Sequence, residues 1–138
     1  MKFVVDTNVI IASLIKDSVT RKFLIETPHT LYAPEFAITE IENHLEELIK
    51  KTKKDKRDIL LMLKLVVSNI EIVSKTETYK AMDEAIQIIG NEDKNDAPII
   101  ACAIRVNADG IVTYDKDFRK QKRFRILIPE ELIKIQEK

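Results

Sequence analysis

Three aspartates stand where their carboxylates can work together, although they are far apart in the chain. Asp6 follows the apolar run at residues 2–5, and Asp115 comes shortly after a second such run at residues 111–113. Asp96 opens the apolar stretch DAPIIACAI, just before that second run. Carboxylates a few Å apart raise one another's pKa, and the usual compensation is a hard divalent cation such as Mg²⁺ or Mn²⁺. A site for one or two such ions is therefore predicted.

A fourth carboxylate, Glu40, is expected on a helix that starts at Pro34 and runs to about residue 51. Glu42 is its competitor, but two residues further along a helix a side chain points about 200° away. If Ala37 and Ile41 face the core, Glu40 lies beside that face and Glu42 leans outward. Taken singly, each of these acids is more often a turn former, a helix cap or a solvated residue, so the prediction depends on their convergence.

Short apolar runs alternate with helical patterns along the whole chain, which indicates an α/β fold with a central parallel sheet covered by helices. A single domain spanning residues 1–138 is expected. The predicted strands lie at 2–5, 30–33, 70–73, 111–113 and within 125–129. About seven helices are predicted, at about 8–14, 20–26, 34–51, 55–68, 77–89, 97–106 and from residue 129.

The predicted sheet explains how the distant acids would meet. In open parallel sheets, ligands bind in the crevice beyond the carboxyl ends of the strands. Asp6 and Asp115 each come after a strand, so they would lie at the same edge, provided that the two strands are neighbours.

Other chemistry has little support in the sequence. There is no glycine-rich phosphate loop and no cysteine and histidine spacing suited to zinc. His29 and His44 are isolated and are expected to be surface or structural residues. No segment approaches the ~20 apolar residues of a membrane helix, and one cysteine makes no internal disulfide. We therefore expect a soluble, cytoplasmic protein that does not associate with a membrane.

The formal net charge is zero, with 23 basic and 23 acidic residues, but two short runs, KKTKKDKR and RKQKRFR, are strongly basic. A charge run is usually a solvated surface, and two of them together still favour contacts with phosphate groups. The candidate RNA-binding residues are Lys50, Lys51, Lys53, Lys54, Arg119, Lys120 and Arg123.

Four stretches, FVVDTNVIIASL, PEFAITEIENHL, NDAPIIACAI and GIVTYDKDF, resemble in order and spacing the acidic motifs of PIN-domain ribonucleases. The resemblance extends from residue 2 to about residue 129. It implies a three-layer α/β/α sandwich and a metal-dependent endoribonuclease. Many members are toxins of VapBC-type toxin–antitoxin pairs and form homodimers, so an antitoxin partner and an RNA substrate are also implied.

Carried over by motif, the four family acids are Asp6, Glu40, Asp96 and Asp115, with Asp6, Asp96 and Asp115 as metal ligands. The resemblance assigns supporting roles to Asn8 and Thr7, beside the first acid, and to Thr113, the hydroxyl residue before the fourth. Two alternatives stay open: Asp93 can share or take the role of Asp96, and Asp117 can supplement Asp115.

Two other functions compete with RNA hydrolysis. The acidic pocket can serve a non-catalytic interaction module, or the chain can be a structure-specific DNA nuclease. The predicted helix at 55–68 bears on assembly because it is apolar around most of its circumference. Either this helix is central within the monomer or it forms a homodimer interface, which is the arrangement that we expect.

Overall fold

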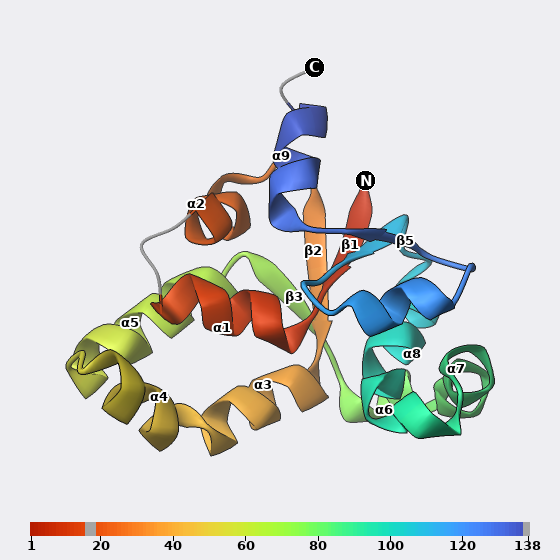
Figure 1. The fold of residues 1–138 in the computed structure, drawn as a ribbon, viewed down its shortest axis with the longest axis horizontal. Helices are drawn as coiled ribbons and strands as arrows, with labels where there is room; N and C mark the ends of the chain where they lie inside the picture. Colours follow the sequence, from red (N-terminus) through yellow and green to blue (C-terminus); the bar gives the residue numbers. More distant parts are fainter. Residues whose placement is uncertain (16–18, 137–138) are drawn as a thin grey trace.

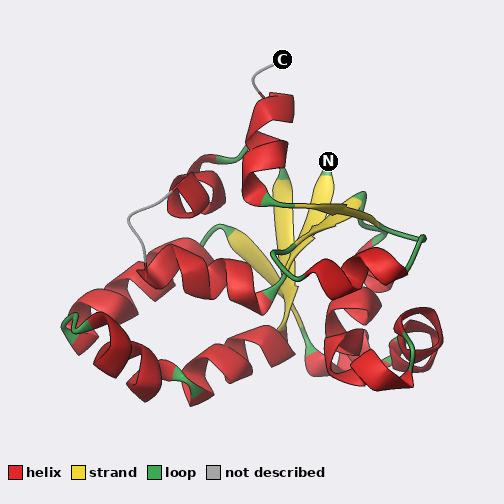
Figure 2. Ribbon diagram, in the orientation of Figure 1, coloured by secondary structure: helices red, strands yellow, loops and turns green. Residues whose placement is uncertain are grey.

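The computed structural model describes residues 1–15 and 19–136, which form a five-stranded, all-parallel sheet between two layers of helices (Figures 1 and 2). The spatial order of the strands is β3-β2-β1-β4-β5. The elements are β1 (Lys2–Val5), α1 (Thr7–Ile15), α2 (Val19–Glu26), β2 (Thr30–Pro34), α3 (Glu35–Asn43), α4 (Leu45–Thr52), α5 (Lys56–Val67), β3 (Ile70–Val73), α6 (Lys75–Tyr79), α7 (Met82–Ile89), the 3-10 helix η1 (Asn91–Asp96), α8 (Ala97–Val106), β4 (Gly110–Val112), the 3-10 helix η2 (Lys116–Lys120), β5 (Arg125–Leu127) and α9 (Pro129–Gln136).

The central strands are apolar at consecutive positions because both faces of the sheet are covered. Along β1, Phe3 and Val5 belong to one hydrophobic core and Val4 to the other. The first core also takes in residues of α1, α2, α3, α4, α5 and α9, and the second is built largely from α7 and α8. The predicted three-layer α/β/α arrangement is confirmed.

Two predicted helices are each divided in the structure. The helix expected at 34–51 consists of α3 and α4, which are separated at His44 with φ −101° and ψ 6°. The break reorients the chain so that α4 can bury Leu48 in the first core. No glycine or proline marks this break, which is why the helical pattern appeared continuous.

The second division falls at Lys80 and Ala81, between α6 and α7, so the helix expected at 77–89 was also wrong as a single element. Its cause is burial: Ala81 is 4% exposed and belongs to the second core. In addition, the polar segment NEDKND, between the helices predicted at 77–89 and 97–106, forms the 3-10 helix η1.

β1 pairs with β2 on one side and with β4 on the other, both in parallel. The chain therefore builds one half of the sheet outward from β1, then returns to β1 to build the other half. The strands meet closely at Gly110, where an added Cβ would lie 2.9 Å from the carbonyl oxygen of Arg125 and 3.3 Å from the Phe3 ring. The order of the strands thus reverses at β1, between β2 and β4, and ligand crevices form at such points in open α/β sheets.

None of the helices in the described ranges is long and apolar enough to cross a membrane.

Candidate metal centre at the sheet edge

A cleft of about 560 Å³ opens at the carboxyl ends of β1 and β4. Its walls come from the residues that follow these strands, from the end of β2, from α3 along its length, and from the starts of α1 and α8. The lining residues are Asp6, Thr7, Asn8, Ile11, Pro34, Phe36, Ala37, Glu40, His44, Asn95, Asp96, Pro98, Ile99 and Asp115. The structure thus brings the four predicted acids to one cleft from four separate segments.

Asp6 is fixed by both strands and by the helix that follows it. Its backbone N–H donates to the Val112 carbonyl at 2.9 Å, which continues the β1–β4 pairing past the end of β1. Its carboxylate accepts two hydrogen bonds, from the Thr7 N–H at 2.7 Å and from the Thr113 hydroxyl at 2.8 Å. Burial nevertheless raises the pKa of Asp6 above its usual range, and the charges of Asp115 and Glu40 act in the same direction.

The Thr113 side chain links the first and fourth acids. Its hydroxyl oxygen accepts the Asp115 N–H at 2.9 Å and donates its proton to Asp6. Asp115 is then held from its other side, because its carboxylate accepts the Asp117 N–H at 2.9 Å and caps η2. Thr113 is 1% exposed, so neither of its bonds is replaced by water. This single hydroxyl therefore sets the relative position of two carboxylates.

Asp96 stands at the N-cap position of α8, yet its side chain makes no capping hydrogen bond. Burial first, and then the charges of Asp115, Asp6, Asp93 and Asp117, raise its pKa to about 6. Every one of these influences acts in the same direction, as expected for a partly buried carboxylate that is surrounded by other carboxylates. The ordinary role of an aspartate at a helix start does not account for this residue.

The structure places Glu40, and not its competitor Glu42, on the wall of the cleft. Glu40 is solvent-exposed there and adds to the negative charge felt by Asp6. Asn8 and Thr7 also line the cleft, and the Asn8 side chain accepts the Tyr114 N–H at 3.3 Å. Asn8 thus ties the start of α1 to the segment between Thr113 and Asp115.

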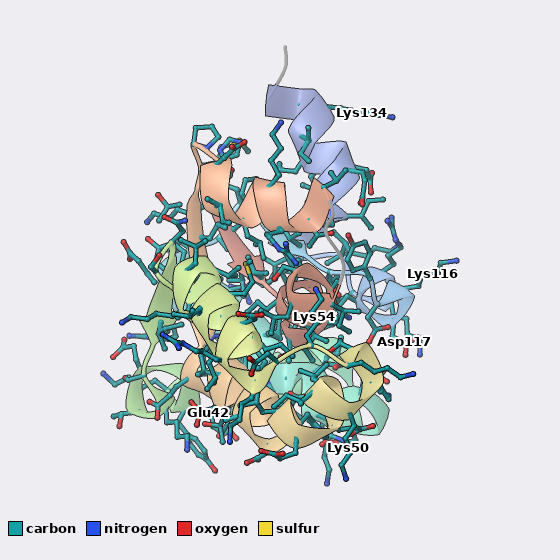
Figure 3. The ribbon with its side chains drawn as sticks, turned by 90° about the vertical axis from the view of Figure 1, so that its left-hand side faces the viewer. Glu42, Lys50, Lys54, Lys116, Asp117 and Lys134 are labelled. Atoms are coloured by element: carbon teal, nitrogen blue, oxygen red, sulfur yellow. The ribbon has the colours of Figure 1, made fainter. Side chains whose placement is uncertain are left out.

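The two alternative acids lie outside the lining of the cleft. Asp93 pairs with the ammonium of Lys120 at 3.5 Å. Asp117 is exposed and projects from η2 at the margin of the molecule, next to Lys116 (Figure 3). Both act on Asp96 through their charge.

The donor set suits a hard divalent cation, since the four acids offer only carboxylate oxygens and the pKa values of Asp6 and Asp96 are raised by burial and by negative neighbours. Within residues 1–15 and 19–136, no three histidine, cysteine or acidic side chains stand close enough together to hold an ion between them. Mg²⁺ commonly binds through one or two carboxylates and keeps several waters. These residues therefore fit a partly hydrated ion better than a closed protein cage.

Several predicted RNA-binding residues are engaged in ion pairs. Lys51 pairs with Glu47 on α4, and Arg119 and Arg123 pair with Glu131 and Glu84. Lys120 lies between Asp93 and Asp117, beside the acidic cleft. The remaining residues of the first run, Lys50, Lys53 and Lys54, are exposed at α4 and just beyond it, where Lys50 and Lys54 are labelled in Figure 3.

Eight residues of the cleft wall were not among the predicted site residues, and three of them, Phe36, His44 and Asn95, have aromatic or polar side chains. Phe36 and His44 lie four residues on either side of Glu40, which is the spacing of one helix face. That spacing was the available signal for both of them once Glu40 had been chosen. Asn95 directly precedes Asp96 and carried no such signal.

Replacing Thr113 by valine tests the hydroxyl bridge. Thr113→Val keeps the shape of the side chain but leaves a buried oxygen of Asp6 and the Asp115 N–H without their partner. We expect the free energy of unfolding to fall by about 1–3 kcal/mol, measured by urea denaturation in EDTA. Thr113→Ser retains the hydroxyl and should lose about 1 kcal/mol at most, for one methyl group. Equal stability of the two variants would contradict the bridge.

The raised pKa of Asp96 predicts that the metal-free protein loses stability as the pH rises. The folded state keeps the Asp96 proton up to about pH 6, whereas an ordinary aspartate loses it near 3.8. The free energy of unfolding therefore falls as the pH rises through this window. Asp96→Asn removes that loss, so in EDTA it should be more stable than wild type at about pH 7. Because the carboxylate is partly exposed, screening limits the gain to about 1 kcal/mol, or roughly 3–5 °C in Tm.

This gain should disappear at about pH 4, where the wild-type carboxyl is largely protonated. Glu71→Gln, which neutralises an exposed acid on β3, is the matched control and should show no gain at either pH. A difference between Asp96→Asn and wild type that is independent of pH would contradict the assignment.

Comparison with solved structures shows where this fold occurs. The crystal structure of VapBC2 from Rickettsia felis, bound to a DNA fragment from their promoter, matches with a TM-score of 0.65 and 21% identity, over 93% of this chain and 98% of that chain. The crystal structure of PAE2754 from Pyrobaculum aerophilum matches with a TM-score of 0.69 and 17% identity, over 100% of this chain and 91% of that chain. No curated protein matches the chain.

A family profile described as "PIN domain" matches residues 4–124. This range contains the four acids of the cleft and all but the last strand and helix of the fold. PIN domains are generally nucleases. Since the profile covers most of the sequence and the fold agrees with it, this chain belongs to the PIN-domain family.

Proposed function

We propose that this chain is a metal-dependent endoribonuclease that hydrolyses phosphodiester bonds in single-stranded RNA, with residues 1–138 acting as one nuclease domain. The observation that carries the proposal is the convergence of four carboxylates on one cleft, where burial and neighbouring acids raise the pKa values of Asp6 and Asp96. Such an arrangement concentrates negative charge, which a metal ion would neutralise when it binds.

In this proposal Asp6, Asp96 and Asp115 hold one or two partly hydrated Mg²⁺ or Mn²⁺ ions, each bound through only one or two of these carboxylates. When bound, such an ion supplies an activated water and stabilises the charge that develops on the phosphate. The Thr7 N–H and the Thr113 hydroxyl keep the Asp6 carboxylate oriented. Glu40, exposed on the wall of the cleft, binds metal or orients the attacking water. Without a cation, the cleft would repel a polyanion.

The size of the cleft supports a single strand as the substrate. About 560 Å³ is a volume typical of small-ligand pockets, which suits a few flexible nucleotides better than a rigid duplex. Exposed basic residues lie outside the acidic centre, at Lys50, Lys53 and Lys54 and around η2. They would contact phosphates away from the cut site and make binding dependent on salt.

The biological setting that we propose is a toxin of a toxin–antitoxin pair. The support is the similarity in fold to VapBC2 from Rickettsia felis. A cognate antitoxin would then bind this chain and block RNA cleavage. A processing nuclease without an antitoxin would have the same centre, so a neighbouring reading frame for a small DNA-binding protein would distinguish the two settings.

We also propose that the chain forms a homodimer through α5. This helix buries Ile59 and Val66 but leaves Leu60, Leu61 and Leu65 exposed, at 41%, 58% and 48%. It is therefore not central within the monomer, which was the alternative reading of its apolar sequence. An apolar strip of this kind on a surface helix is typical of protein interfaces.

Cleavage of a labelled single-stranded RNA tests the proposed activity. We expect cleavage with Mn²⁺ and none with EDTA. Asp96→Asn and Asp115→Asn should each lower the rate at least about 100-fold, since changes in outer-shell partners alone cost 10- to 100-fold. Glu42→Gln is the matched control. Glu42 lies on α3, as Glu40 does, but it does not line the cleft, so this variant should cleave at a rate near that of wild type.

Equal cleavage under all these conditions would overturn the proposal. Cleavage of DNA flaps or single-stranded DNA, but not of RNA, would favour a DNA nuclease. Absence of Mn²⁺ binding at millimolar concentration, measured by calorimetry, would favour a non-catalytic interaction module.

Light scattering coupled to size-exclusion chromatography tests the proposed dimer. Wild-type protein should have twice the mass of the chain, and Leu61→Glu should shift it to the monomer because the interface would bury a charge. Tyr79→Glu changes another exposed residue, at 68% exposure, outside α5, and should leave the dimer intact. A monomeric wild type at tens of micromolar would contradict this interface.

A further inference from the structure

Phe36 differs from the other four phenylalanines in its surroundings. The chain has five phenylalanines. Phe3 and Phe23 are buried in the first core, Phe118 is buried in the second, and Phe124 packs against the second. Among the described residues, Phe36 alone of the five belongs to neither core, and it is half-buried on the wall of the acidic cleft. Its position is therefore not explained by packing of the fold.

The placement of Phe36 relative to the acids is set by α3. Phe36, Glu40 and His44 follow one another at intervals of four residues and all line the cleft, so they form one stripe along the helix. Four residues correspond to about 6 Å along a helix axis. The ring thus lies one helical turn from Glu40, on the same wall as this carboxylate and close to where a reacting phosphate would sit.

A cation accompanies the ring. The Lys75 ammonium lies over the Phe36 ring, 5.8 Å from its centroid. The Lys75 backbone N–H donates to the Glu35 carboxylate at 3.2 Å, which joins the start of α6 to the start of α3. These two helices begin at the carboxyl ends of the neighbouring strands β2 and β3, where Pro34 is in register with Val73 (Figure 1). An aromatic face and a positive charge are therefore held together beside an otherwise acidic cleft.

This pair matches the chemistry of a nucleotide in an unpaired strand. Proteins bind single-stranded RNA by stacking its exposed bases on aromatic rings and by placing cations against the phosphates. A base offers a flat π surface that needs no specific hydrogen bond, so one phenylalanine is sufficient to hold it. A buried aliphatic side chain from a protein partner would use the ring but would gain nothing from the ammonium.

We propose that Phe36 and Lys75 form a substrate subsite in which the ring stacks on one base of single-stranded RNA and the ammonium contacts an adjacent phosphate. The subsite rests on the proposed ribonuclease function and adds a positioning role that the four acids do not supply. It would fix the register of the strand one nucleotide or more from the bond that is cut.

Binding of a fluorescein-labelled single-stranded RNA, measured by anisotropy with Ca²⁺, tests the subsite. Phe36→Leu keeps apolar bulk but removes the stacking surface, so affinity should fall about tenfold, the effect of losing one stacked base. Phe36→Trp should restore it, which excludes a folding defect as the cause. Lys75→Gln should weaken binding and reduce its dependence on salt. Tyr79→Leu removes an exposed aromatic outside the cleft and should bind as wild type does.

A scan with single abasic nucleotides supplies the decisive comparison. In wild type, one abasic position should weaken binding about as much as Phe36→Leu does, and in Phe36→Leu the same position should cause no further loss. Unchanged affinity of Phe36→Leu, or the same abasic profile in both proteins, would overturn the subsite. Mn²⁺-dependent cleavage of the same RNA by wild type separates the two proposals. If wild type cleaves the RNA and one of those two results is also found, the subsite proposal fails and the nuclease proposal stands. Wild type that neither binds nor cleaves RNA would overturn both.

Discussion

The parallel pairing of β1 with β4 is the constraint on which the site depends. It places Asp6 next to Val112 and lets the Thr113 hydroxyl reach the Asp6 carboxylate across 107 positions of sequence. The same hydroxyl accepts the Asp115 N–H, so two acids take their positions from one buried oxygen. α1 and η2 then start just beyond strand ends that are already fixed. The rest of the fold covers this pair of strands and brings Glu40 and Asp96 to it.

This arrangement lowers the stability of the fold, because like charges lie close together where water cannot fully screen them. Burial and neighbouring acids raise the pKa values of Asp6 and Asp96, so part of the folding free energy opposes their ionised forms. The two apolar cores, on opposite faces of the sheet, supply the compensating stability. Strain of this electrostatic kind is common at functional sites and rare elsewhere. In the proposed function, a bound cation would supply the positive charge that these carboxylates lack.

Local patterns in the sequence were sufficient for the strands and for the position of three acids. Runs such as FVV and IIACAI are apolar at successive positions, and only strands or helices enclosed by other elements tolerate that. Helix ends at His44 and Ala81 were missed because neither is marked by glycine or proline, and their causes lie in tertiary burial of Leu48 and Ala81. Phe36 was missed for a related reason. An aromatic residue in an amphipathic helix looks like a core residue, and only the three-dimensional packing of the two cores shows that Phe36 belongs to neither.

The long separation between Asp6 and its partner at Thr113 has a consequence for the newly made protein. A chain emerging from the ribosome presents Asp6 first, but the hydroxyl that orients it arrives more than a hundred residues later. Contacts of such high sequence separation form late in folding. Until β4 has been synthesised and inserted beside β1, the first acid has no fixed geometry and the nascent chain has no assembled centre. The proposed ribonuclease would in this way stay inert while its own message is still being translated.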